Sequence, residues 1–161
     1  MAGKFKDREA IIEQIVLTKY QSYFRMAMSL VKNRDDAEDI VQEGAYKAIR
    51  SAAKLKNPEF AATYVYRIML NEAYKFLSEK KHVSIDEEEF LEPITFDTYE
   101  DTDLKKALDA MDVKDRTVIV LKYFEDMKLE EISNILDENL STVKSRLYRG
   151  LKKLRLEIGE E

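Results

Sequence analysis

The chain has 161 residues, of which 45% are hydrophobic, and it carries a formal net charge of −5. This length suits one compact domain or two very small ones, and the scarcity of glycine and proline disfavours a turn-rich β-sandwich. The lack of cysteine excludes disulfides, thiol nucleophiles and cysteine-based metal sites, and the single histidine, His82, excludes sites that need two imidazoles.

The first eighty residues predict three helices. Apolar residues recur at three- and four-residue steps from Ile11 to Leu30, and the run Asn33–Asp36 breaks that pattern. A second helix is expected over about 35–53 and a third over about 58–80. The stretch Asn57-Pro58-Glu59 suits the start of the third helix, because Asn can cap, Pro fits the first position and Glu favours the positive end of the helix dipole.

Residues 81–103 differ in charge from both flanks. They hold one basic and nine acidic side chains, whereas residues 1–80 carry a net charge of +3 and residues 104–161 a net charge of zero. The segment has no sustained helical period and is interrupted by Pro93, so we expect an acidic linker between two domains. Apolar residues scattered through it, such as Phe90, predict that the linker docks, either on its own domains or on a partner.

The last part of the chain predicts four further helices, and the final two have helix-turn-helix spacing. Their expected positions are around Leu104–Met111, 114–124, 129–136 and 141–157. The turn between the last two covers Asp137 to Leu140, and Ser141 or Thr142 is expected to cap the final helix. Since no strand alternation or internal repeat occurs, the predicted fold class is all-α, with two small helical domains joined by the acidic linker.

The final helix has one apolar and one basic side. The apolar stripe consists of Val143, Leu147, Leu151, Leu154 and Ile158. The first turn combines short donors with long cations, which suits base edges in the major groove and the flanking phosphates. The candidate DNA-binding residues are Ser141, Thr142, Lys144, Ser145, Arg146, Arg149, Lys152 and Lys153. A solvated basic face of an ordinary helical bundle has a similar pattern, so that alternative stays open.

The sequence indicates neither a catalytic centre nor a membrane segment. No GxGxxG or GxxxxGK[ST] motif occurs, and the carboxylates show no convergent spacing, so an enzyme with a carboxylate metal site has little support. The N-terminus lacks the apolar run of a signal peptide, and no stretch approaches the roughly 20 apolar residues of a membrane span. We therefore expect a non-enzymatic cytoplasmic protein, without a cofactor and without stable membrane insertion of its own.

Three motifs, in chain order, resemble those of bacterial RNA polymerase sigma factors of the extracytoplasmic-function group. DAEDIVQE (36–43) resembles the polymerase-binding motif of that group, and YVYRIMLN (64–71) resembles its promoter-melting motif. The segment from Leu129 to Arg155 is similar to its C-terminal DNA-binding region. The resemblance covers nearly the whole chain and implies an alternative sigma factor that directs promoter-specific transcription initiation. A stand-alone helix-turn-helix regulator with an unrelated dimerisation domain is the alternative.

For the N-terminal domain, residues 1–80, the resemblance implies two binding surfaces. One would bind the clamp helices of the largest polymerase subunit, and its candidate residues are Asp36, Asp39, Ile40, Gln42 and Glu43. The other would bind the melted minus-10 element with help from the loop Lys54–Phe60, and its candidates are Tyr64, Tyr66, Arg67, Asn71 and Lys75. Rings, an amide and cations suit unstacked bases, although Tyr64 and Tyr74 also fit an ordinary core.

For the rest of the chain, the resemblance implies a C-terminal domain, residues 104–161, that binds the minus-35 element and the polymerase flap. The linker would run through the RNA-exit path, where its negative charge would mimic RNA. An anti-sigma factor is a further implied partner. The family often has Gly at the positions of Asp137 and Ser141, and usually Trp at that of Tyr64. These departures concern promoter preference rather than membership.

Overall fold

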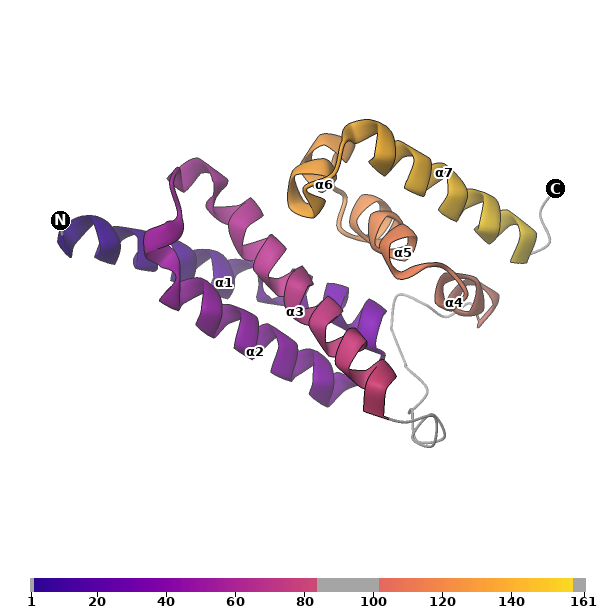
Figure 1. The fold of residues 1–161 in the computed structure, drawn as a ribbon, viewed down its shortest axis with the longest axis horizontal. Helices are drawn as coiled ribbons and strands as arrows, with labels where there is room; N and C mark the ends of the chain where they lie inside the picture. The colour runs from indigo at the N-terminus through magenta and orange to yellow at the C-terminus, as the bar shows by residue number, and fades with distance from the viewer. Residues whose placement is uncertain (1, 84–101, 158–161) are drawn as a thin grey trace. The chain divides into compact units, whose positions relative to one another are not determined.

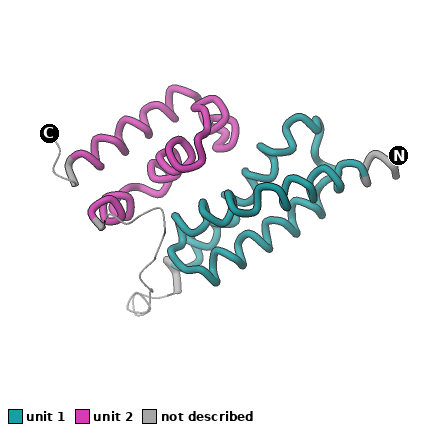
Figure 2. The backbone as a smooth tube through the Cα atoms, turned by 180° about the vertical axis from the view of Figure 1, so that it is seen from behind, with its two compact units in different colours: residues 1–92 teal, residues 93–161 magenta. Residues whose placement is uncertain are grey.

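The computed structural model of the protein describes residues 2–83 and 102–157 (Figure 1). The chain divides into two compact units, residues 1–92 and 93–161 (Figure 2). All regular elements within the described residues are helical, so the all-α prediction is confirmed. None of the described helices is long and apolar enough to cross a membrane.

Unit 1 contains three helices that pack against one another: α1 (Ala2–Val31), α2 (Arg34–Arg50) and α3 (Ala61–Val83). Lys19 has non-helical backbone angles inside α1. The core consists of apolar and aromatic side chains from all three helices, which include Ile12, Tyr23, Met26, Leu30, Val41, Val65, Met69 and Leu70. Gly44 lets α2 approach α3 closely, because a Cβ at this position would overlap Met69 Sδ.

Asparagine caps two helix starts in unit 1, and only the cap at Asn57 was predicted from the sequence. Asn33 caps α2 by accepting a hydrogen bond from the Asp36 backbone N–H at 3.0 Å. Asn57 accepts from the Glu59 N–H at 3.0 Å, and Pro58 occupies the next position, as predicted. The cap belongs to a short 3-10 turn, Pro58–Phe60, which leads directly into α3.

Unit 2 contains α4 (Thr102–Asp109), α5 (Val113–Ile119), α6 (Leu129–Leu136) and α7 (Leu140–Glu157). Helix α5 continues into a π-helical segment, Val120–Phe124, in which the Glu125 N–H bonds to the Val120 carbonyl. The core of the unit consists of Ala107, Leu108, Met111, Val118, Ile119, Leu121, Ile132, Val143 and Leu147. The α5–α7 contact is close, since a Cβ on Gly150 would lie 2.9 Å from Ile119 Cγ1.

The turn between α6 and α7 differs in one detail from the prediction. Asp137 ends α6 in the left-handed region, with φ 54° and ψ 44°, a conformation that Gly adopts most easily. Helix α7 then begins at Leu140, and the Val143 N–H bonds to the Asn139 carbonyl at 3.0 Å. The prediction that Ser141 or Thr142 caps α7 is therefore wrong, because both residues already lie in its first turn.

The ends of the predicted acidic linker are helical. Residues 81–83 belong to α3 and residues 102–103 to α4. The remainder of the predicted linker, residues 84–101, lies outside the described residues.

Candidate nucleic-acid and polymerase interfaces

The acidic side of α2 is exposed at three of its five candidate positions. Asp39, Gln42 and Glu43 are exposed, and Asp36 is half-buried. Burial is the main cause that raises the pKa of the Asp36 carboxyl, and the charges of Asp39 and Asp35 add to it. Ile40 is only 4% exposed and belongs to the core of unit 1. The surface that α2 offers a partner is therefore mainly polar.

Three candidates on α3 form one exposed stripe. Arg67, Asn71 and Lys75 follow at steps of four residues, so they lie on one side of the helix, and all three are exposed. Tyr66 lies on the other side: it is 2% exposed and meets the Tyr23 ring edge-on, with ring centroids 5.2 Å apart. Tyr66 is thus a core residue, which differs from the prediction that it meets DNA.

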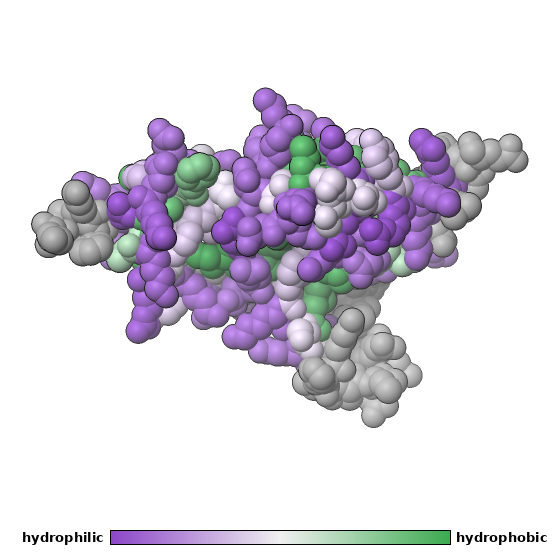
Figure 3. Space-filling model, turned by 45° about the horizontal axis from the view of Figure 1, so that its top comes forward, coloured by the Kyte–Doolittle hydropathy of each residue, from purple (hydrophilic) through white to green (hydrophobic). Residues whose placement is uncertain are grey.

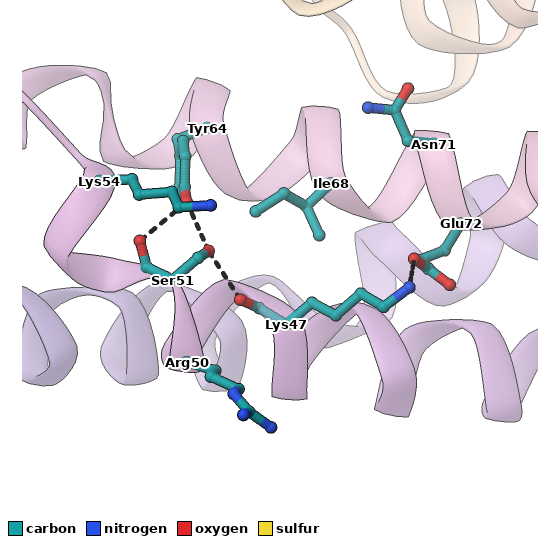
Figure 4. Close-up of a pocket in the computed structure, with 8 residues that line it drawn as sticks. All are labelled: Lys47, Arg50, Ser51, Lys54, Tyr64, Ile68, Asn71 and Glu72. Carbon is teal, nitrogen blue, oxygen red and sulfur yellow. Dashed lines mark hydrogen bonds and ion pairs between the residues drawn. The ribbon is translucent and has the colours of Figure 1, made fainter.

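A pocket of about 580 Å³ lies between α2 and α3 beside this stripe (Figure 4). It is lined by Lys47, Arg50, Ser51, Lys54, Tyr64, Ile68, Asn71 and Glu72. The predicted residues Tyr64 and Asn71 thus share one pocket, with Lys54 from the predicted loop. The α2 residues Lys47 and Arg50, and Ser51 after them, were not among the candidates, because only the packing of α2 on α3 brings them to the same place.

Hydrogen bonds fix the walls of this pocket. The Tyr64 hydroxyl donates to the Ser51 carbonyl at 3.0 Å and lies 2.5 Å from Ser51 Oγ. Lys47 Nζ lies 2.5 Å from Glu72 Oε1, and this hydrogen bond is the main cause that raises the pKa of Lys47. Arg50 points away from α3 (Figure 4). It donates to the Tyr46 hydroxyl at 2.7 Å.

The contents of the pocket suit an unstacked nucleotide. Tyr64 and Ile68 offer a ring and an apolar surface, Asn71 offers an amide donor and acceptor, and Lys54 offers a positive charge beside them. Lys47 is already neutralised by Glu72. Such a set can hold one base and the phosphate next to it.

The exposed side of α7 carries cations, hydroxyls and one ring. Its exposed residues are Ser141, Lys144, Ser145, Tyr148, Arg149, Lys152 and Arg155, and Thr142 and Lys153 are half-buried. The sequence from Asn139 to Leu156 contains no acidic residue. Tyr148 is 66% exposed and was not among the candidates, although it follows Lys144 by four residues and so lies on the same side.

Arg146 lies differently from the other basic candidates of α7. Its side chain is 16% exposed and donates to Glu138 through Nε and Nη2, at 3.2 Å and 3.0 Å, and to Asp115 Oδ1 at 3.2 Å. The hydrogen bond to Glu138 is the main cause that raises the pKa of Arg146. This guanidinium binds inside unit 2, which differs from the prediction that it meets base edges.

Polar side chains cover most of the surface that Figure 3 displays, and hydrophobic residues show in small patches. Among the residues whose burial the structure describes, the large hydrophobic side chains that are exposed are Leu17, Tyr46, Phe60, Tyr123 and Tyr148. Within residues 2–83 and 102–157, no group of three or more His, Asp or Glu side chains is placed to hold a metal ion.

Both units match known protein families. Residues 16–83 match the family model for sigma-70 region 2, and residues 101–154 match the model for sigma-70 region 4. The chain is 42% identical over 161 residues to RNA polymerase sigma factor SigV of Bacillus subtilis, with 98% of this chain and 97% of that protein covered. It is 28% identical to the ECF RNA polymerase sigma factor SigW of the same organism, with 94% and 90% covered.

A solved structure has a similar fold. The sigma factor RpoE of Bartonella quintana, crystallised with the anti-sigma factor NepR, superposes with a TM-score of 0.75. The match covers 91% of this chain and 96% of that one, at 24% sequence identity. At this identity the likeness concerns the fold alone.

Proposed function

The chain belongs to the extracytoplasmic-function group of sigma-70 RNA polymerase sigma factors, and we propose which of its surfaces carries each step of promoter recognition. It is an alternative sigma factor, which binds core RNA polymerase and directs promoter-specific transcription initiation. A stand-alone regulator is not favoured, because residues 16–83 match sigma-70 region 2 and not an unrelated dimerisation domain. The proposed division of labour is residues 1–80 for core polymerase and the minus-10 element, 81–103 for the linker, and 104–161 for the minus-35 element.

The exposed side of α7 binds the minus-35 element. The observation that carries this assignment is a helix surface of cations and hydroxyls without an acid, in a unit that matches sigma-70 region 4. Ser141, Lys144, Ser145 and Arg149 face base edges, and Thr142 supports the first turn. Lys152 and Lys153 lie further along the helix and bind phosphates, which supply affinity without sequence preference. Arg146 acts inside the unit.

The pocket between α2 and α3 receives a base of the melted minus-10 element. Asn71 reads the base edge, because an amide can donate and accept at once. Tyr64 and Ile68 bound the base, while Lys54 attracts its phosphate. Arg67 and Lys75, which flank Asn71 on the same side of α3, follow the backbone of the single strand.

Helix α2 binds the clamp helices of the largest polymerase subunit. Asp39, Gln42 and Glu43 supply the exposed polar contacts, with Asp36 at the edge. Ile40 contributes by holding α2 on the core of unit 1. Unit 2 contacts the polymerase flap. The acidic segment, most of which lies outside the described residues, passes through the RNA-exit path as an RNA mimic.

The protein acts in the cytoplasm, catalyses no reaction itself and is held inactive by an anti-sigma factor. The support for this partner is that sigma factors of the same fold, such as RpoE of Bartonella quintana, are found in complex with anti-sigma factors. That the protein itself catalyses no reaction is supported by its family, because sigma factors direct a polymerase and the polymerase performs the chemistry.

In vitro transcription with core polymerase tests the proposal. Purified protein and core enzyme are incubated with a promoter library, and the transcripts are sequenced. We expect start sites downstream of one shared pair of minus-35 and minus-10 elements, and none with core enzyme alone. Folded protein that yields no promoter-specific transcript would contradict the function, whereas tight binding to a palindrome without polymerase would favour a stand-alone regulator.

A further inference from the structure

Asp115 is a buried carboxylate that two arginines of α7 share. It lies on α5, outside the helix-turn-helix, and its side chain is 4% exposed. Its Oδ1 accepts a hydrogen bond from Arg146 Nη1 at 3.2 Å, and its Oδ2 lies 3.4 Å from Arg149 Nε. A carboxylate this deeply buried needs ionic partners, and its two oxygens are divided between these two arginines.

The two arginines differ in what they can offer to DNA. Arg146 is mostly buried, and Glu138 and Asp115 between them bind all three of its guanidinium nitrogens. Arg149 is 61% exposed, and its ion pair with Asp115 uses Nε, the nitrogen nearest the aliphatic stem. A guanidinium has five N–H donors, so the four on the Nη atoms of Arg149 lie beyond this contact. Arg149 is therefore held at one end and exposed at the other.

Arg146 holds Asp115 in place from the other side. Its second acceptor, Glu138, belongs to the turn between α6 and α7, and that turn is itself fixed to α6. The Glu138 N–H donates to the Ser133 carbonyl at 3.1 Å, and Ser133 Oγ donates to the Glu138 carbonyl at 2.5 Å. One chain of contacts thus runs from α6 through the turn and Arg146 to Asp115, and from there to Arg149.

We propose that Asp115 is a positioning residue for promoter reading, which fixes the guanidinium of Arg149 in one orientation on the exposed side of α7. This inference rests on the proposed function, in which that side binds the minus-35 element. A bidentate contact with a base edge requires a planar fork in a defined orientation. An arginine without a partner loses rotamer freedom when it makes such a contact. A buried carboxylate restricts the rotamers of the arginine before DNA binds, so less freedom is lost on binding.

If Asp115 acted only by repelling phosphates, its removal would strengthen specific binding instead of weakening it. An acid beside a DNA-binding surface repels phosphates, so its removal should strengthen binding to every sequence, including the preferred one. A positioning role predicts weaker discrimination between sequences, with binding to random DNA unchanged or stronger. A role in stability alone predicts loss in proportion to the unfolded fraction. The ratio of specific to non-specific binding falls only under the positioning role. The other two roles are separated by total binding, which rises if Asp115 only repels phosphates and falls if it only stabilises the fold.

The test compares three full-length proteins, each bound to core polymerase: wild type, Asp115→Asn and Asp112→Asn. Each holoenzyme selects promoters from a library with a randomised minus-35 window. We expect Asp115→Asn to lower the preference at one or two base positions by about tenfold. This is a large part of the discrimination that one bidentate contact provides against a wrong base. Asp112→Asn removes an equal charge 3.8 Å from Arg146, and Asn can still cap α5, so it should keep the preference.

Two further variants connect the effect to Arg149. In an Arg149→Ala background, Asp115→Asn should cause no further loss of preference, because the two residues act as one unit. Glu138→Gln weakens the pairing of Arg146, which lies one step further from Arg149 than Asp115 does, so it should lower the melting temperature and reduce the preference less than Asp115→Asn does. Additive effects in the first comparison, or an equal loss of preference in Glu138→Gln, would overturn the positioning role.

If Asp115→Asn does not fold, wild-type protein still tests the positioning role of Asp115. The Arg149 Nε–H should exchange slowly with solvent in NMR spectra of the free protein, and exchange as fast as that of Arg155 would overturn the proposal. Failure of the proposed function gives a different result in the promoter selection from failure of the positioning role. A wild-type holoenzyme without any preference in the minus-35 window removes the premise, whereas a preference that is independent of Asp115 removes only the positioning role.

Discussion

The Tyr64 hydroxyl donates a hydrogen bond to the Ser51 carbonyl at 3.0 Å and thereby joins α3 to the end of α2. Tyr64→Phe removes this donor at a half-buried site, so we expect the free energy of unfolding to fall by about 1 kcal/mol. Urea denaturation measures the change. Tyr46→Phe is the matched control: its hydroxyl accepts from Arg50 at an exposed site, and the variant should stay within about 0.5 kcal/mol of wild type.

Asn71→Ala should reduce transcription without reducing stability. Asn71 is exposed in the middle of α3, where Ala is the better helix former, so the free energy of unfolding should stay equal or rise slightly. Loss of one base contact should lower open-complex formation by about tenfold, which permanganate footprinting of the melted region measures. Ser78→Ala, an exposed change on the same helix outside the pocket, should leave melting unchanged. Equal melting by both variants would remove Asn71 from base reading.

Helix positions were predictable from the sequence because each helix buries one side in its own unit. Arg67, Asn71 and Lys75 repeat at four-residue steps and are exposed, while Val65 and Met69 repeat likewise and are buried. Asn57 capped a helix start as predicted, because capping depends on local backbone geometry alone. Periodicity and capping are local properties, so one sequence suffices to recognise them.

Contacts between helices were not predictable, because they depend on which side chains of the neighbouring helix lie opposite. Lys47 and Tyr64 share a pocket because α2 packs against α3, and one sequence does not show which residues of the two helices meet. Arg146 was grouped with the other cations of α7, although it directly precedes the apolar Leu147 and meets acids from α5 and the α6–α7 turn. Tyrosine and arginine have apolar stems and polar ends, so their residue type does not decide between core and surface.

Asp137→Gly should stabilise unit 2. Asp137 has a left-handed backbone conformation, with φ 54°, at the end of α6. Gly adopts this conformation without steric cost but loses more backbone entropy on folding, so we expect a net gain of about 0.5 kcal/mol. Thermal denaturation followed by circular dichroism measures it. Glu130→Gly, an exposed change within α6, should instead lower stability by about 1 kcal/mol, and a loss of that size in Asp137→Gly as well would contradict the argument.

Tyr23→Phe should change how stability depends on alkaline pH. The Tyr23 hydroxyl is buried and has no hydrogen-bond partner within the described part of the chain, and burial raises the pKa of its phenol above the usual value of 10. Below that value both folded and unfolded states keep the proton. Above it the unfolded state ionises first, so folding loses stability as pH rises. The phenylalanine variant should lose less stability above pH 10, which urea denaturation at a series of pH values tests, with Tyr123→Phe as the exposed control.

Arg146→Met should lower the stability of unit 2 far more than a change at an exposed cation of the same helix. Met keeps most of the stem but leaves Asp115 and Glu138 without the guanidinium that binds both, and breaking a buried ion pair in this way costs about 3 kcal/mol. Lys144→Met, at an exposed position, should stay within about 0.5 kcal/mol of wild type. Urea denaturation of both variants decides between two roles for Arg146. Equal stability of the two variants, together with a changed minus-35 preference in Arg146→Met, would restore the prediction that Arg146 reads bases.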